Sequence, residues 1–143
     1  MRKILMLAAF VPAALAAQGK AEASPSTAPK AKPEIFFRFP NNGSTVGKTF
    51  PVVFGMRNYG VAPAGVKVNS TGHFHVLVDS DAPAAGAVIP NDSLHRHFGT
   101  GLIETTITLS PGTHTLRLVL GDFEHKVISA ELISQPITVT IKP

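Results

Sequence analysis

Apolar and polar residues alternate with a period of two in several short segments of the chain. The pattern recurs in residues 35–39, 50–54, 74–78, 103–109, 116–120 and 137–141. Successive side chains of a strand point to opposite faces of a sheet, so this period indicates half-buried strands. No window of the same region shows the sustained 3.6-residue period of an amphipathic helix. The pattern therefore predicts an all-β domain.

Turn-forming residues separate these segments. Residues 41–44 (Asn-Asn-Gly-Ser) tolerate positive φ, and residues 83–90 are rich in Pro, Ala and Gly. The Ser-Pro-Gly-Thr segment 110–113 is expected to join 103–109 and 116–120 as a hairpin. Short strands separated by turns favour a sandwich over an α/β fold. We predict an immunoglobulin-like antiparallel β-sandwich.

The first 33 residues differ in composition from the rest. Arg2 and Lys3 precede an apolar run, residues 4–17, and small residues follow, which is the order of a secretory signal peptide. A membrane anchor is the alternative, but the run is shorter than the roughly 20 residues of a spanning helix. We assign residues 1–23 to a signal peptide with its cleavage region, 24–33 to a Pro/Ala/Lys-rich tether, and 34–143 to one folded domain. This organisation predicts a periplasmic or secreted protein that does not span the membrane after signal cleavage.

Charge and cysteine content exclude several classes of function. The formal net charge is +4, but residues 34–143 contain eight basic and eight acidic side chains. Such a near-neutral domain has no basic surface for nucleic acid. The chain has no cysteine, and so no disulfide and no thiolate ligand or nucleophile. The serines follow no nucleophile motif. A non-enzymatic role is therefore expected, and an enzyme of unrecognised chemistry is the open alternative.

Six histidines lie in the predicted domain, and four of them form two His-x-His pairs. Residues two apart on a strand share a face at about 6–7 Å, so both imidazoles of a pair can bind one ion. The pair at 73 and 75 is expected on the face opposite the apolar set of residues 74–78, away from the core. Strand ends and loops meet in a sandwich, so a cluster is plausible. The candidate metal ligands are His73, His75, His95, His97, His114 and His125.

The ligand type narrows the choice of metal. Imidazole nitrogen, with or without carboxylate, suits Cu(II), Zn(II) or Ni(II). Met56 is the only methionine after the predicted signal peptide, so a Met-rich Cu(I) carrier is disfavoured. Asp79, Asp92 and Asp122 are candidate partners for ring N–H groups, although a turn cap or a solvated acid is the alternative for each.

Several ordered motifs carry a resemblance to a known family. They are Gly-Val-Ala-Pro-Ala-Gly at 60–65, Thr-Gly-His-Phe-His at 71–75, His-Arg-His-Phe-Gly at 95–99, Pro-Gly-Thr-His-Thr-Leu at 111–116 and Leu-Val-Leu-Gly-Asp at 118–122. Over nearly all of 35–142 the chain resembles a bacterial family of exported domains, domain of unknown function 4399. The resemblance implies a periplasmic or secreted β domain whose histidines recur as motif positions, and it implies no established activity.

The chain departs from that family pattern at two places. Phe74 stands where such sequences often have a further histidine, and residues 126–128 lack another histidine expected downstream. If those positions bind metal in other members, the site here is weaker or differently composed.

The Gly-His-Phe-His segment is also similar to the His-x-His of copper-zinc superoxide dismutases, another β-sandwich family. The rest of that pattern, including its disulfide cysteines, is missing. We therefore expect a non-enzymatic exported domain whose histidine cluster binds copper or zinc. The alternative is an immunoglobulin-like interaction module for an envelope protein or cell-envelope polysaccharide, in which the histidines order loops.

Overall fold

The computed structural model describes residues 31–143. Its strands are β1 (Glu34–Phe39), β2 (Ser44–Val46), β3 (Thr49–Arg57), β4 (Gly60–Val61), β5 (Thr71–Val78), β6 (His95–Phe98), β7 (Glu104–Thr108), β8 (Gly112–Gly121) and β9 (Ile137–Ile141), with a 3-10 helix, η1 (Ala130–Leu132), before β9. The predicted signal peptide and residues 24–30 of the predicted tether lie outside the described residues. Within residues 31–143, no helix is long and apolar enough to cross a membrane.

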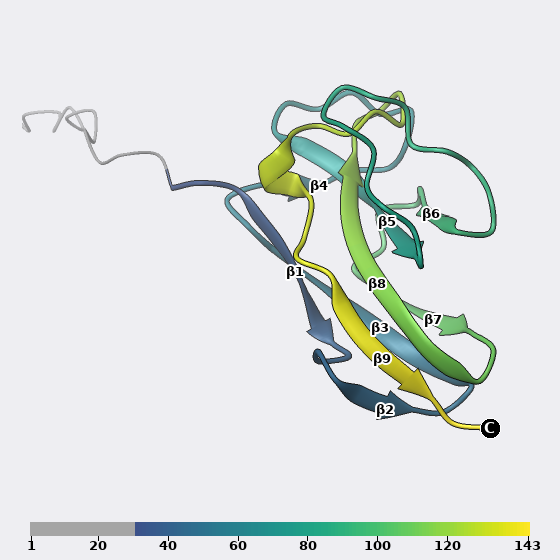
Figure 1. Ribbon diagram of the computed structural model, residues 1–143. Coiled ribbons are helices and arrows are strands. Elements are labelled where there is room, and N and C mark those ends of the chain that lie inside the picture. Colours follow the sequence, from purple (N-terminus) through teal and green to yellow (C-terminus); the bar gives the residue numbers. More distant parts are fainter. Residues whose placement is uncertain (1–30) are drawn as a thin grey trace, which may run out of the picture.

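Two sheets pack against each other (Figure 1). The smaller sheet has the strand order β1-β3-β7, and the larger has the order β2-β9-β8-β5-β4, with β6 also paired to β5. The long pairings are antiparallel, whereas the short strands β2 and β4 pair in parallel with β9 and β5. The prediction of an all-β antiparallel sandwich is confirmed.

The core lies between the sheets and is built from the inward positions of the alternating segments. Phe54 of β3 meets Phe74 of β5 across it, with ring centroids 4.7 Å apart. Burying a side chain of this size contributes about 1.5–3 kcal/mol relative to leaving it exposed. The most deeply buried members of the core are Val52, Phe74, Val76, Leu116, Leu118, Leu120, Leu132 and Val139.

The predicted hairpin between 103–109 and 116–120 is wrong. Strand β7 pairs with β3 in the smaller sheet, whereas β8 pairs with β5 and β9 in the larger one. The bend at Ser110 and Pro111 therefore carries the chain from one sheet to the other, and Gly112 takes a φ of 135° there, which glycine tolerates. Pro-Gly predicts a change of direction, but it does not determine which strand the next segment will pair with.

Strand β5 is buried on both faces. Its outer face packs through Leu77 on a second apolar cluster with Ile89, Val119 and Val127. The loops after β5 and β8 form this cover and bond to each other, since the Ile89 N–H donates to the His125 carbonyl at 2.8 Å. His73 and His75, which lie on the same outer face, are each only 1% exposed. The pair therefore lies on the face opposite Phe74, Val76 and Val78, as predicted, but that face is covered, which strand periodicity does not reveal.

Candidate metal centre

Four of the six candidate histidines lie together. His73 and His75 come from β5, His97 from the neighbouring β6, and His125 from the loop that follows β8. The centroids of their rings are 4.7–5.9 Å apart. Ring nitrogens of His73, His97 and His125 all lie within 4.8 Å of one another, which is close enough to hold a metal ion. We call the four residues the histidine cluster.

Two pairs of ring nitrogens within the histidine cluster are spaced like adjacent ligands of one ion. The Nε2 atoms of His73 and His75 are 3.0 Å apart, and those of His97 and His125 are 3.1 Å apart. Nitrogens bound to Zn(II) at about 2.0 Å are separated by about 3.3 Å in a tetrahedral site. Neighbouring ligands of a square-planar Cu(II) ion are separated by about 2.8 Å. The observed distances fall between these two values.

Three rings of the histidine cluster, those of His73, His75 and His97, have a lowered pKa and are held in their neutral form. Burial, and then the neighbouring histidines, lower the pKa of His75 from 6.5 to about 3. The same two effects lower the pKa of His73 to about 4, and burial and His125 lower the pKa of His97. Neutral imidazole carries the lone pair that a metal ion requires, so these three rings are in a binding form at neutral pH.

Hydrogen bonding leaves part of the histidine cluster unsatisfied. The Nδ1 atoms of His73 and His75 are buried and have no hydrogen-bond partner among the described residues. If one Nε2–H donates to the other Nε2, the second ring must carry its proton on Nδ1. That buried donor then lacks an acceptor, at a cost of about 1–3 kcal/mol. Stability alone therefore does not explain why two imidazoles are buried here.

Two glycines make room for the rings. A Cβ atom on Gly99 would lie 2.3 Å from Cε1 of His97, and one on Gly121 would lie 3.0 Å from Nε2 of His75. Any side chain at Gly99 would therefore displace the His97 ring. Both glycines stand in the motifs described above, but only the three-dimensional contacts show their role.

Asp122 shapes the turn that presents His125. Its Oδ1 atom accepts hydrogen bonds from the N–H groups of Glu124 and Lys126, both at 2.9 Å. His125 adopts a φ of 63°, in the left-handed region, which costs about 1–3 kcal/mol for a residue other than glycine unless its surroundings hold it. Asp122 is thus a turn cap that fixes His125, and its carboxylate accepts backbone N–H groups instead of a ring N–H.

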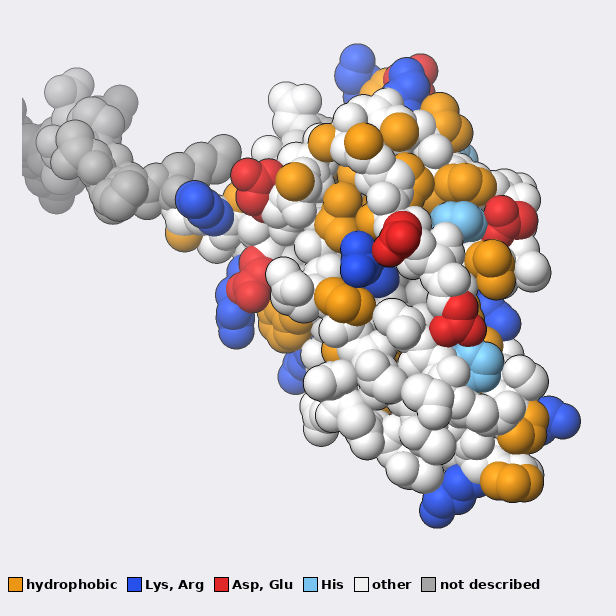
Figure 2. Space-filling view, in the orientation of Figure 1, with side chains coloured by type: hydrophobic (Ala, Val, Ile, Leu, Met, Phe, Trp, Pro, Cys, Tyr) orange, Lys and Arg blue, Asp and Glu red, His pale blue; other side chains and the backbone are white. Residues whose placement is uncertain are grey.

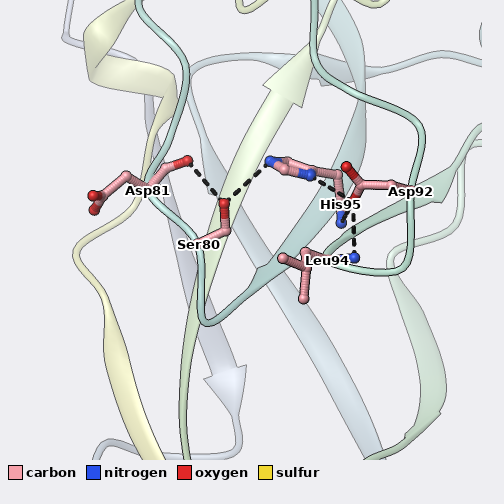
Figure 3. A network of polar contacts seen from close by, with 5 residues as sticks. All are labelled: Ser80, Asp81, Asp92, Leu94 and His95. Carbon is pink, nitrogen blue, oxygen red and sulfur yellow. Dashed lines mark hydrogen bonds and ion pairs between the residues drawn. The ribbon is translucent and has the colours of Figure 1, made fainter.

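His95 lies outside the histidine cluster. Its Nδ1 is 2.8 Å from Oδ1 of Asp92, and its Nε2 is 3.3 Å from Oγ of Ser80 (Figure 3). The same Asp92 oxygen accepts hydrogen bonds from the N–H groups of Leu94 and His95, at 2.9 and 3.0 Å. Both ring nitrogens of His95 thus take part in a hydrogen-bond network that orders the turn just before β6.

His114 also lies outside the histidine cluster. Its Nδ1 is 2.6 Å from Oδ2 of Asp79, and its Nε2 is 3.0 Å from the carbonyl oxygen of Ser110. Asp79 and Asp92 therefore do bond to histidine rings, but to the two that are not part of the histidine cluster.

Figure 2 shows histidine only as small pale-blue areas on the face in view, with acidic and basic side chains scattered between them.

A hollow of about 350 Å³ adjoins the histidine cluster. Two neighbouring apolar residues line it: the side chain of Ile89 is buried, whereas that of Val88 is 61% exposed. The residues that line this hollow are His75, Val88, Ile89, Pro90, Asn91, His97, Glu124 and His125. No sequence pattern indicates this arrangement, because the lining comes from four segments: β5, residues 88–91, β6 and the loop after β8.

A family model described as "Domain of unknown function (DUF4399)" matches residues 52–142. No curated protein matches the chain, and no solved structure does. The matched region contains the whole histidine cluster and covers more than half of the chain. The chain therefore belongs to the DUF4399 family, whose description assigns no activity.

Proposed function

We propose that this domain is an exported, non-enzymatic metal-binding protein, periplasmic or secreted, that holds one Cu(II) or Zn(II) ion in the histidine cluster. The observation that carries the proposal is the convergence of three ring nitrogens, from β5, β6 and the loop after β8, within 4.8 Å of one another. His75 lies beside this triad, with its Nε2 atom 3.0 Å from that of His73.

The donor set supports copper or zinc over harder ions. Within residues 31–143, no carboxylate bonds to a ring nitrogen of the histidine cluster. Ca(II) and Mg(II) take oxygen ligands, whereas neutral imidazole suits Cu(II) and Zn(II).

The alternative, an interaction module with structural histidines, describes His95 and His114 well. Both of those rings hold loops through an acid and a second oxygen. Among residues 31–143 the rings of the histidine cluster have no such acid partners, and they contact one another. The metal-binding proposal therefore accounts for more of the structure.

Titration calorimetry at pH 7.5 tests the proposal. The metal-free protein should bind one equivalent of Cu(II) or Zn(II) with a Kd below about 10 µM, which corresponds to about 7 kcal/mol. Replacing His97 or His125 by Ala should weaken binding at least tenfold, because each change removes one nitrogen of the triad. Neither residue is fully buried, so the fold should survive the change.

His114→Ala is the matched control, since it removes a histidine outside the histidine cluster and should leave the affinity unchanged. His73→Ala and His75→Ala are less suitable because both side chains are buried. If the wild-type protein binds neither ion at this affinity, the interaction-module alternative replaces the metal-binding proposal. Equal losses in the His97 and His114 variants would mean that the ligands are assigned wrongly.

A further inference from the structure

The histidine cluster adjoins two hollows. His75, His97 and His125 line the hollow described above, whereas His73 lines a separate hollow of about 330 Å³. The first hollow measures about 350 Å³, far more than the roughly 10–15 Å³ that one water molecule requires. Any molecule in this space would lie directly against three of the four imidazoles.

Three protein ligands leave room on the metal for one further ligand that does not come from the protein. A zinc ion held by three protein side chains commonly keeps a further position for water or another small ligand. Two residues of the triad, His97 and His125, line this hollow. An ion bound by the His73, His97 and His125 nitrogens would therefore turn its remaining position toward the hollow.

The charge of the site favours an anion at that position. Imidazole ligands are neutral, so the bound ion would keep its full charge of +2. The charge of Glu124, which also lines the hollow, is balanced by Lys126, whose Nζ atom lies 3.2 Å from Glu124 Oε2, and Asp122 Oδ1 accepts two backbone N–H groups. The apolar side chains of Val88, Ile89 and Pro90 favour a weakly hydrated anion over a strongly hydrated one.

We propose that the bound metal keeps an open coordination position facing this hollow and binds a small monovalent anion there. This inference rests on the proposed metal binding and adds the class of ligand that the metal takes. The ligand enters past Val88 and bonds to the metal, while the histidine cluster stays in place.

Azide is the probe, added to the full mature protein loaded with Cu(II). An azide-to-copper charge-transfer band should appear in the absorption spectrum and saturate at one azide per copper. Val88→Trp should weaken azide binding at least tenfold, because the larger side chain fills the mouth of the hollow. The copper content, measured by elemental analysis, should not change, since Val88 contributes no ligand.

Val66→Trp is the matched control. Val66 is also an exposed valine, 48% accessible, but it lines a separate hollow on the His73 side. This variant should bind azide like the wild type. No charge-transfer band in copper-loaded wild type, or loss of the band in Val66→Trp instead of Val88→Trp, would overturn the inference. A wild-type protein that takes up no copper would overturn the metal-binding proposal itself, so the two failures are distinguishable.

Discussion

At the scale of single residues, Asp79 and His114 form a hydrogen-bonded pair that joins the end of β5 to the start of β8. The Asp79 carboxylate accepts hydrogen bonds from the Thr115 N–H at 2.7 Å and from His114 Nδ1 at 2.6 Å. The bond to Asp79 raises the pKa of His114, and the Ser110 carbonyl contributes to the same shift. Burial raises the pKa of Asp79, but the hydrogen bonds from Thr115 and His114 together outweigh it, and the net shift is downward.

These two pKa shifts predict the pH range in which the pair of Asp79 and His114 stabilises the fold. The contribution of His114 is fully present below its unfolded pKa of about 6.5 and is lost as the pH rises through its higher folded pKa. The contribution of Asp79 is present above about 3.9 and is lost as the pH falls through its lower folded pKa. Asp79→Asn should therefore destabilise the protein more at about pH 5.5 than at about pH 8.5 in urea unfolding. The difference should not exceed about 1 kcal/mol, because the Asp79 side chain is 45% exposed and screened by solvent. Equal losses at both pH values would contradict the assignment.

At the scale of elements, local patterns predict strands but not their partners. Alternation correctly identified the buried faces of β3, β5 and β8, since that signal lies within each segment. It did not show that β7 and β8 belong to different sheets, because pairing depends on contacts between distant residues. Ile103 and Phe39 also fit the alternating pattern, yet both side chains are exposed.

The central position of β8 leads to a prediction about packing. Leu118 is 0% exposed, lies opposite Val76 of β5, and belongs to the main core. Leu118→Ala should lower the free energy of unfolding by about 2–5 kcal/mol, as expected for a truncated buried leucine. Val66→Ala, at an exposed position, should change it by no more than about 0.5 kcal/mol. Urea unfolding followed by circular dichroism measures both, and a near-zero effect at Leu118 would contradict the observed register.

At the scale of the whole molecule, the sequence predicted the histidines as candidates but did not separate the histidine cluster from the other two. Asp92, three residues before His95, was a local hint that His95 closes a turn. The contact between Asp79 and His114 joins residues 35 positions apart, and no local pattern reveals it. The roles of Gly99 and Gly121 likewise depend on contacts that form only in the folded state.

Burying neutral histidines makes the metal-free protein sensitive to acid. The pKa values of His73 and His75 are about 4 and 3 in the folded state, against about 6.5 in the unfolded chain. Below about pH 6.5 the unfolded chain binds more protons, so stability should fall as the pH drops toward these folded values. The slope should be at most about 1.4 kcal/mol per pH unit for each ring. Urea unfolding at about pH 7, 6 and 5 measures it, and a flat profile would mean that these rings accept protons without unfolding.

The covering of β5 also determines when a metal site exists. His97 and His125 are 28 positions apart in sequence, and they meet His73 and His75 only after β6 has paired with β5 and the loop after β8 has closed. Bringing such distant segments together lowers the entropy of the chain, and only the contacts of the folded state offset this loss. A chain threaded through a membrane channel in extended form carries all four histidines but no assembled site. Under the proposed export and metal binding, the ion would therefore be acquired where the protein folds, and its supply in that compartment would add to the stability of the folded form.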